Sequence, residues 1–209
     1  MDLVLERCSV VLVGAWNLAI FSPEWVGGRL FPDEAELQFG FGTGAGVGAA
    51  MHYRTSKLRL TASAGRLEIK PLHEDDGCFA TAGEAARDIV RLLPETPLVG
   101  CGVNVGFDTH NIDVLRDSGQ IADEKLLVAA GVSIVETRTD RTITFDGVTF
   151  SFSVHRGPDL GVLKIDFNYH CSVSNSQQAL SFLERNAAQG RARSTHFLEE
   201  VYRIGKEAT

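Results

Sequence analysis

The stretch Gly161-Val-Leu-Lys-Ile-Asp-Phe-Asn-Tyr-His-Cys171 alternates strictly between apolar and polar side chains. Every second residue from Leu163 to Cys171 is apolar, and the residues between them are Lys164, Asp166, Asn168 and His170. Because successive side chains of a strand point to opposite faces, the stretch predicts a strand with one apolar and one polar face. Such a strand packs one side on a core and offers the other to water or a ligand.

A hairpin is predicted shortly before this strand. Two alternating runs, Ile143–Phe145 and Val148–Phe150, flank Asp146-Gly147, and an Asp-Gly pair supplies the positive φ angles of a type I′ turn. The turn places Phe145 opposite Val148 and Ile143 opposite Phe150, with Phe152 and Val154 on the same side. We therefore expect Phe150 and Phe167 to be buried on one side of one sheet.

Short strand runs and helical segments alternate along the rest of the chain. Strands are predicted at Cys8–Gly14, Ala35–Phe41, Lys57–Ser63, Arg66–Leu72 and Leu98–Asp108. Helix starts are predicted at Ser22-Pro23, at the capping box Thr81–Glu84 and at Ser174–Gln177. The first helix is expected to be short because Gly27-Gly28 follows at once, and Gly190 is a predicted helix end. Residues 111–130 are interpreted as a linker with a short helix.

The fold class that these patterns favour is α+β. We expect a mainly antiparallel sheet with helices packed on its apolar face, in a single domain, 1–209. Each half contains strands followed by a helix, so two similar halves, 1–110 and 111–209, sharing one sheet are a second arrangement that stays open.

The overall composition bounds the class of protein. The chain has 209 residues, of which 44% are hydrophobic and 22% charged, as in globular proteins that bury a full core. The formal charge of −7 argues against binding nucleic acid, which requires a concentrated basic surface. The four cysteines form no C-x-x-C pair, which predicts reduced core cysteines, no metal and a cytoplasmic location. The apolar run 8–21 is too short to span a bilayer, so no membrane association is expected.

Two local motifs suggest a phosphate site and a metal site, and each also has a purely structural interpretation. The glycine run Gly40–Gly48 could cradle phosphate, but no amphipathic helix and no Gly-Lys-Ser/Thr ending follow it, so we interpret it as a loop or strand edge. His73-Glu74-Asp75-Asp76 offers metal-binding groups, yet consecutive residues cannot all converge on one ion, and a solvated turn is the better interpretation. No cofactor is implied by either motif.

The polar face of the strand at Gly161–Cys171 holds the best cluster of reactive groups. Asp166, Asn168 and His170 lie on it, and Asn104 lies on the side-chain-poor strip formed with Gly100, Gly102 and Gly106. Such glycines are expected to mark close approach of a ligand or another backbone, or equally bulges. With a short turn at Pro158, His155 would pair near Val162 and lie about 13 Å from Asp166, too far for a dyad. A solvent-facing sheet surface explains all of these residues without a function.

The opening Val13-Gly-Ala-Trp-Asn-Leu-Ala-Ile-Phe-Ser-Pro-Glu-Trp25 resembles a loosely matching group of uncharacterised bacterial proteins. Their N-termini have a similar strand, an asparagine, Ala-Ile and a Pro-Glu-Trp helix start. Further resemblance lies in Leu58–Ile69, the helix leading to Thr96-Pro97, the strand Gly100–Asn104 and the strand Asp166–His170. The resemblance implies a bacterial, soluble α+β protein of unknown function, and it implies no site residues.

No nucleophile elbow, HExxH, Walker motif or zinc spacing occurs, so nothing ranks an enzyme above a binding module. We expect a non-enzymatic binding or assembly protein that acts through a polar sheet face or a sheet edge. The binding residues predicted are Asn168, His170, Asp166 and Asn104, and a protein partner or self-association is favoured over a small molecule. The alternative is a small-molecule hydrolase or transferase with a site around Asp166, Asn168 and His170.

Overall fold

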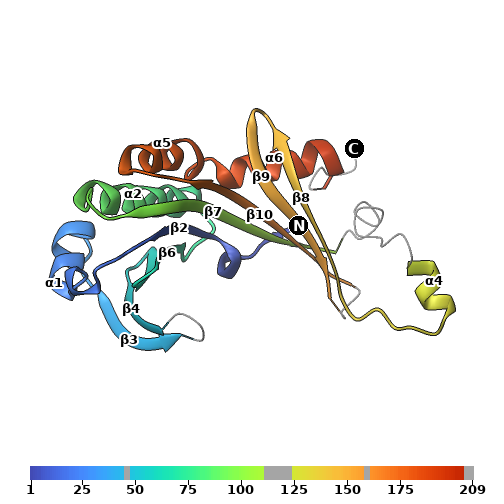
Figure 1. Ribbon diagram of the computed structural model, residues 1–209, viewed down its shortest axis with the longest axis horizontal. Coiled ribbons are helices and arrows are strands. Elements are labelled where there is room, and N and C mark those ends of the chain that lie inside the picture. The colour runs from blue at the N-terminus through green and yellow to red at the C-terminus, as the bar shows by residue number, and fades with distance from the viewer. Residues whose placement is uncertain (45–47, 111–123, 158–160, 205–209) are drawn as a thin grey trace. The chain divides into compact units, whose positions relative to one another are not determined.

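The computed structural model describes residues 1–44, 48–110, 124–157 and 161–204, and it is an α+β fold built on a sheet of ten strands (Figure 1). The strands are β1 (Asp2–Leu3), β2 (Ser9–Gly14), β3 (Gln38–Gly44), β4 (Gly48–Arg54), β5 (Leu58–Ser63), β6 (Arg66–Pro71), β7 (Leu98–Thr109), β8 (Thr137–Phe145), β9 (Val148–Arg156) and β10 (Leu163–Ser172). The helices are α1 (Pro23–Trp25), α2 (Asp76–Leu92), α4 (Glu124–Ala129), α5 (Ser176–Asn186) and α6 (Gly190–Tyr202), with short helical turns at Leu5–Arg7, Leu18–Ile20 and Val26–Leu30.

The strand order is β3-β4-β5-β6-β2-β7-β10-β9-β8, and β1 pairs with β7. Each strand pair with a defined register is antiparallel, as the alternating sequence patterns predict. The chain forms two compact units. Unit 1 consists of Met1–Arg7, Val105–Asn168 and Arg191–Thr209, and unit 2 consists of Cys8–Asn104 and Tyr169–Gly190. Whether the halves 1–110 and 111–209 resemble each other stays a prediction.

The core of unit 1 is aromatic. Phe197 on α6 places its ring 5.4 Å from Phe150, 5.4 Å from Phe152 and 5.7 Å from Phe167, measured between ring centroids. Phe150 lies on β9, and Phe167 lies on the neighbouring strand β10. Both are almost fully buried, and their ring centroids are 5.5 Å apart. The expected burial of these two residues on one side of one sheet is therefore confirmed.

The helix α2 covers an aliphatic part of the core of unit 2. Ile89 and Val90 on this helix are fully buried, as are Leu12, Leu67 and Ile69 on the strands beneath it. The helix α5 packs beside α2 (Figure 1). A Cβ atom added to Gly83 would lie only 2.6 Å from the Cβ of Ala187, so the glycine permits the close helix approach.

The hairpin predicted at Asp146-Gly147 is confirmed in its turn and in its register. Asp146 and Gly147 have φ angles of 49° and 72°, as a type I′ turn requires. Phe145 pairs with Val148 and Ile143 with Phe150. The second predicted hairpin, β5–β6, also turns at residues 64–65.

Several helix boundaries predicted from local motifs are wrong. Thr81 is not a cap, because α2 begins at Asp76 and the Asp75 carboxylate accepts a 2.8 Å hydrogen bond from the backbone N–H of Cys78. The α5 cap is Asn175 rather than Ser174, since the Asn175 side chain accepts from the backbone of Gln178. Gly190 begins α6 instead of ending a helix.

Two strand and helix limits also differ from the sequence interpretation. The strand predicted at Ala35–Phe41 is β3, Gln38–Gly44, because β4 continues to pair with it through the glycines as far as Gly44. The short helix α1 is capped by Ser22 as expected, but helical structure continues through Gly27-Gly28. Of the linker predicted at 111–130, residues 111–123 lie outside the described part of the chain, and α4 follows them. The turn around Pro158 also lies outside the described residues.

None of the helices described is both long and apolar enough to cross a membrane.

The aromatic core generates the first prediction. Phe167→Ala should lower the free energy of unfolding by about 3–5 kcal/mol, because the fully buried ring would leave a cavity among four other rings. Ser151→Ala should change it by no more than about 0.5 kcal/mol, because Ser151 lies on the opposite face of the sheet. Urea denaturation measures both variants. A larger loss for Ser151→Ala would contradict the assigned register.

Candidate functional site

The polar face of unit 1 carries two rows of charged and hydroxyl side chains. The register of β8, β9 and β10 places Asp166, Ser153 and Asp140 in one row and Lys164, His155 and Arg138 in the next. Directly opposed side chains on adjacent antiparallel strands are close enough to interact. A row rich in carboxylates therefore lies beside a row of basic side chains.

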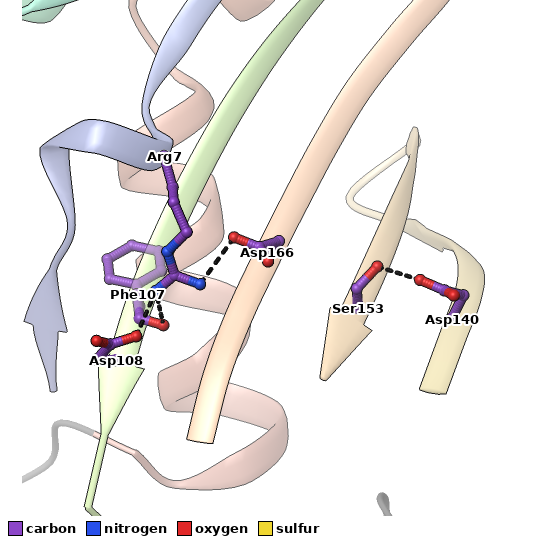
Figure 2. Close-up of polar contacts among 6 residues, drawn as sticks. All are labelled: Arg7, Phe107, Asp108, Asp140, Ser153 and Asp166. Atoms are coloured by element: carbon purple, nitrogen blue, oxygen red, sulfur yellow. Dashed lines mark hydrogen bonds and ion pairs between the residues drawn. The ribbon is translucent and has the colours of Figure 1, made fainter. Parts of the chain in front are cut away.

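Arg7 anchors the acidic row at one end (Figure 2). Its guanidinium group donates to Asp166 at 3.0 Å, to the Asp108 carboxylate, and to the backbone carbonyl of Phe107 at 2.7 Å. The Arg7 side chain is only 23% exposed, so these charge-assisted hydrogen bonds are partly shielded from water. One arginine thus joins the N-terminal segment to β7 and β10 within unit 1.

Gly106 makes room for this arginine. A Cβ atom at Gly106 would lie 2.5 Å from the Cβ of Arg7 and 3.0 Å from an Asp166 oxygen. The glycines of β7 were expected to mark bulges or close approach of a ligand or another backbone. At Gly106 the approaching group is instead an arginine side chain of the same unit.

The other glycines of this strand lie against a neighbouring backbone. A Cβ atom at Gly102 would lie 3.2 Å from the carbonyl oxygen of Tyr169, and one at Gly100 would lie 3.6 Å from that of Cys171. Here the expectation of close approach by another backbone is met by β10, within unit 2.

Asp166 has a perturbed acidity. Burial raises the pKa of its carboxyl group, and the positive charges of Arg7 and Arg138 oppose that effect without cancelling it. The nearby Asp108 raises this pKa further, and His155 lowers it. Asp166 is thus paired with Arg7, and yet the fold makes it easier to protonate than an ordinary aspartate.

Four further groups of the two rows are also paired, namely Ser153, Asp140, Arg138 and His155. Ser153 donates a hydrogen bond to Asp140 (Figure 2). Asp140 accepts a second one from Arg138 at 3.0 Å. The hydrogen bond from Ser153, followed by the bond and charge of Arg138, lowers the pKa of Asp140. The Nε2 atom of His155 lies 2.6 Å from a carboxylate oxygen of Glu136. The serine hydroxyl therefore bonds to a carboxylate and not to an imidazole, unlike the nucleophile of a Ser-His pair.

The distance expected between His155 and Asp166 is wrong. His155 pairs with Lys164, so it is a diagonal neighbour of Asp166 rather than four residues away along the sheet. The reason is the connection between β9 and β10, which spans residues 157–162 and is longer than the short turn assumed. Even so, His155 directs its ring nitrogen to Glu136.

The other predicted binding residues have separate surroundings. Asn168 is exposed and pairs across the sheet with Ser151 in unit 1. His170 is exposed and belongs to unit 2, as does Asn104, whose side-chain amide donates a 3.0 Å hydrogen bond to Ser9. Asp166 bonds to Arg7 and Asn104 to Ser9, and neither partner is among the predicted binding residues. A binding role for the four predicted residues stays a prediction.

A second surface lies at the edge strand β3, which begins the glycine run interpreted from the sequence as a loop or strand edge, but its exposed aromatic side chains were not predicted. Phe39 and Phe41 on β3 are 48% and 63% exposed, although they share a face with the buried Tyr53. β3 pairs with β4 on one side, and no strand of the described residues pairs with its other side. The alternation Phe39-Gly40-Phe41-Gly42, without a charged residue, was the available signal, but only the strand order identifies it as an edge.

No metal site emerges from the described residues, because they contain no group of three or more histidine, cysteine, aspartate or glutamate side chains placed to hold an ion. Comparison of the chain with protein-family models gave no match, and neither did comparison with curated proteins.

The packing of Arg7 over β7 predicts a glycine requirement. Gly106→Ala should destabilise the protein by about 1–3 kcal/mol, because the new methyl group overlaps the base of the Arg7 side chain and displaces it. Gly28→Ala is the control, since a Cβ atom at Gly28, in the helical turn Val26–Leu30, meets nothing within 4 Å. It should leave stability unchanged or slightly raised. Equal effects of the two substitutions in urea denaturation would contradict the arrangement.

The raised pKa of Asp166 predicts a pH dependence. Stability contributed by a carboxyl group with a raised pKa is present at low pH and is lost as the pH rises through that pKa. The stability of the wild type relative to Asp166→Asn, which stays neutral, should therefore decrease as the pH rises from 3.8, the ordinary value, towards neutrality. Urea denaturation of both proteins across this range measures the difference. If the wild type instead became more stable relative to Asp166→Asn as the pH rises, the charge of Arg7 and not burial would dominate the pKa of Asp166.

Proposed function

We propose that this protein is a non-enzymatic assembly protein that associates with a second copy of itself through the free edge of β3. The observation that carries the proposal is the exposure of Phe39 and Phe41 on a strand whose outer edge has no strand partner among the described residues. An edge of this kind offers backbone N–H and C=O groups for pairing with another strand.

The other end of the strand order supports this interpretation by contrast. β8 is also an edge strand, and it carries Arg138, Asp140 and Arg141. Charged side chains are one means by which proteins keep sheet edges from pairing. β3 has no charge from Gln38 to Gly44, so it lacks this protection.

The sequence of β3 is suited to pairing with itself. In an antiparallel pair centred on Gly40, Phe39 of each copy lies opposite Phe41 of the other. Aromatic residues directly opposite each other stabilise a strand pair. Gly40 then faces Gly40 of the second copy, and on that face nothing lies within 4 Å of an added Cβ atom. Two-fold pairing places no like charges together, and it satisfies the symmetry that most homodimers have.

The face bearing the two phenylalanines also favours burial. Phe39 packs its ring 5.2 Å from that of Tyr53, and Tyr53 is almost completely buried. The exposed rings thus continue the core-facing side of the sheet in unit 2. A second copy would extend this apolar surface across the new strand pair and remove the rings from water.

The alternative of a hydrolase or transferase at Asp166, Asn168 and His170 has weaker support. Asp166 is engaged by Arg7, and a general base must be able to accept a proton from a substrate. The ion pairing of the polar face in unit 1 is accounted for by stability alone.

The proposal is tested by the concentration dependence of the mass in solution. Sedimentation equilibrium of the wild type should show a monomer–dimer equilibrium. Phe41→Lys should weaken it at least about 30-fold, because it removes an aromatic contact twice per dimer and introduces charge into the seam. Val99→Lys is the matched control, since Val99 on β7 is 60% exposed but lies outside β3. It should associate like the wild type.

A wild type that remains monomeric at high concentration would overturn the proposal, and so would equal weakening by the two lysine substitutions. The circular dichroism spectrum of Phe41→Lys should match that of the wild type, and so should its urea denaturation at concentrations where the wild type is monomeric. The reason is that Phe41 is 63% exposed and contributes little to the core of one copy. The loss of association can then be assigned to the seam.

A further inference from the structure

Two cysteines face each other across neighbouring strands of unit 2. The backbone N–H of Val173 donates to the carbonyl of Val99 at 3.2 Å, which aligns these two residues of β10 and β7. The Cβ position of Gly102 lies 3.8 Å from the Cβ of His170, which aligns that pair in the same antiparallel register. Counting inward from either pair places Cys101 directly opposite Cys171.

The distance between such positions suits a disulfide. Directly opposed residues of an antiparallel pair have Cα atoms about 4.5–5.5 Å apart, within the range of about 4.4–6.8 Å found for disulfides. Opposed residues also point to the same face of the sheet. Both thiols are free in the structure, and the Cys171 thiol is close enough to Cys101 to interact with it directly.

The two thiols differ in their access to solvent. Cys101 is 3% exposed and lies beside the fully buried Leu12 of β2. Cys171 is only half-buried. Burial, followed by the neighbouring Cys171, raises the pKa of the Cys101 thiol, so Cys101 stays protonated at neutral pH. An oxidant in solution therefore meets Cys171 first.

We propose that Cys101 and Cys171 form an oxidant-responsive dithiol, in which peroxide oxidises Cys171 and Cys101 then closes a disulfide. In the first step the Cys171 sulfur attacks one peroxide oxygen, the O–O bond breaks, and a sulfenic acid and water form. In the second step the Cys101 sulfur attacks the Cys171 sulfur, the S–O bond breaks, and the second water leaves. Two thiols lose two electrons and two protons, and hydrogen peroxide is reduced to two molecules of water.

The remaining two cysteines provide internal controls. Cys8 precedes β2 and Cys78 lies in α2, and both are buried with 2% exposure or less. Burial and the Asp75 carboxylate raise the pKa of the Cys78 thiol. Neither residue lies on the β7–β10 pair, so both should stay reduced under conditions that oxidise Cys171.

The disulfide would enclose the chain between β7 and β10. This segment includes the whole of unit 1 between Val105 and Asn168. Cross-linking residues that are far apart in the sequence limits the freedom of the unfolded chain. The oxidised protein should therefore melt at a higher temperature than the reduced protein, and a thiol reductant should reverse the difference.

The proposal is tested by treating the folded protein with hydrogen peroxide, blocking free thiols with an alkylating agent in denaturant, and digesting with trypsin without reductant. The expected product is a linked pair of peptides, 92–116 and 165–185, two hydrogen atoms lighter than their sum. Cys8→Ser and Cys78→Ser should give the same product, and Cys171→Ser should abolish it.

Recovery of both peptides in alkylated form after peroxide treatment would overturn the proposal. So would a sulfinic acid on Cys171 without any cross-link, or a disulfide that involves Cys8 or Cys78. The peptide map of the wild type decides between these outcomes. The test therefore does not depend on Cys101→Ser, a variant that replaces a buried thiol and could fail to fold.

Discussion

Side chains alternate between the two faces of β10, and this two-residue period decides where each group of the strand can act. Leu163, Ile165 and Phe167 are buried on one face, so a helix must cover them in unit 1. Asp166 is consequently placed on the other face, where it pairs with Arg7. A shift of one residue would exchange the two faces and bury the carboxylate in the aromatic core.

The polar face of unit 1 resolves its charges internally. Arg7 reaches across Gly106 to Asp108 and Asp166, and Arg138 and Ser153 both bond to Asp140. Partly buried carboxylates destabilise a fold unless donors satisfy them, so these contacts are what make a carboxylate-rich row compatible with a packed sheet. The same contacts occupy the groups that a catalytic site would need. The polar face of unit 1 is therefore a surface on which most charged groups are paired with one another.

The capacity for further bonds lies elsewhere: the edge strand β3 can pair with another strand, and two neighbouring thiols can form a disulfide. β3 exposes two aromatic rings and carries no charge, whereas β8 carries three charged side chains. Cys101 and Cys171 lie opposite each other as thiols, with only Cys171 partly accessible. Both features arise from strand pairing: β3 because its outer side has no strand among the described residues, and the cysteines because β7 and β10 are neighbours.

The sequence by itself determined the features that depend on local rules. Asp146-Gly147 dictates its turn through positive φ angles, and the alternation around it places Phe150 and Phe167 in the core. Thr81–Glu84 has the sequence of a capping box, but α2 begins at Asp76, is capped by Asp75 and buries Cys78 and Phe79 in its first turn. Tertiary structure alone decided the partners of Arg7, the opposition of Cys101 and Cys171, and the exposure of Phe41. The physical reason is that these depend on which strands become neighbours, and strand order is set by the packing of distant segments rather than by any local spacing.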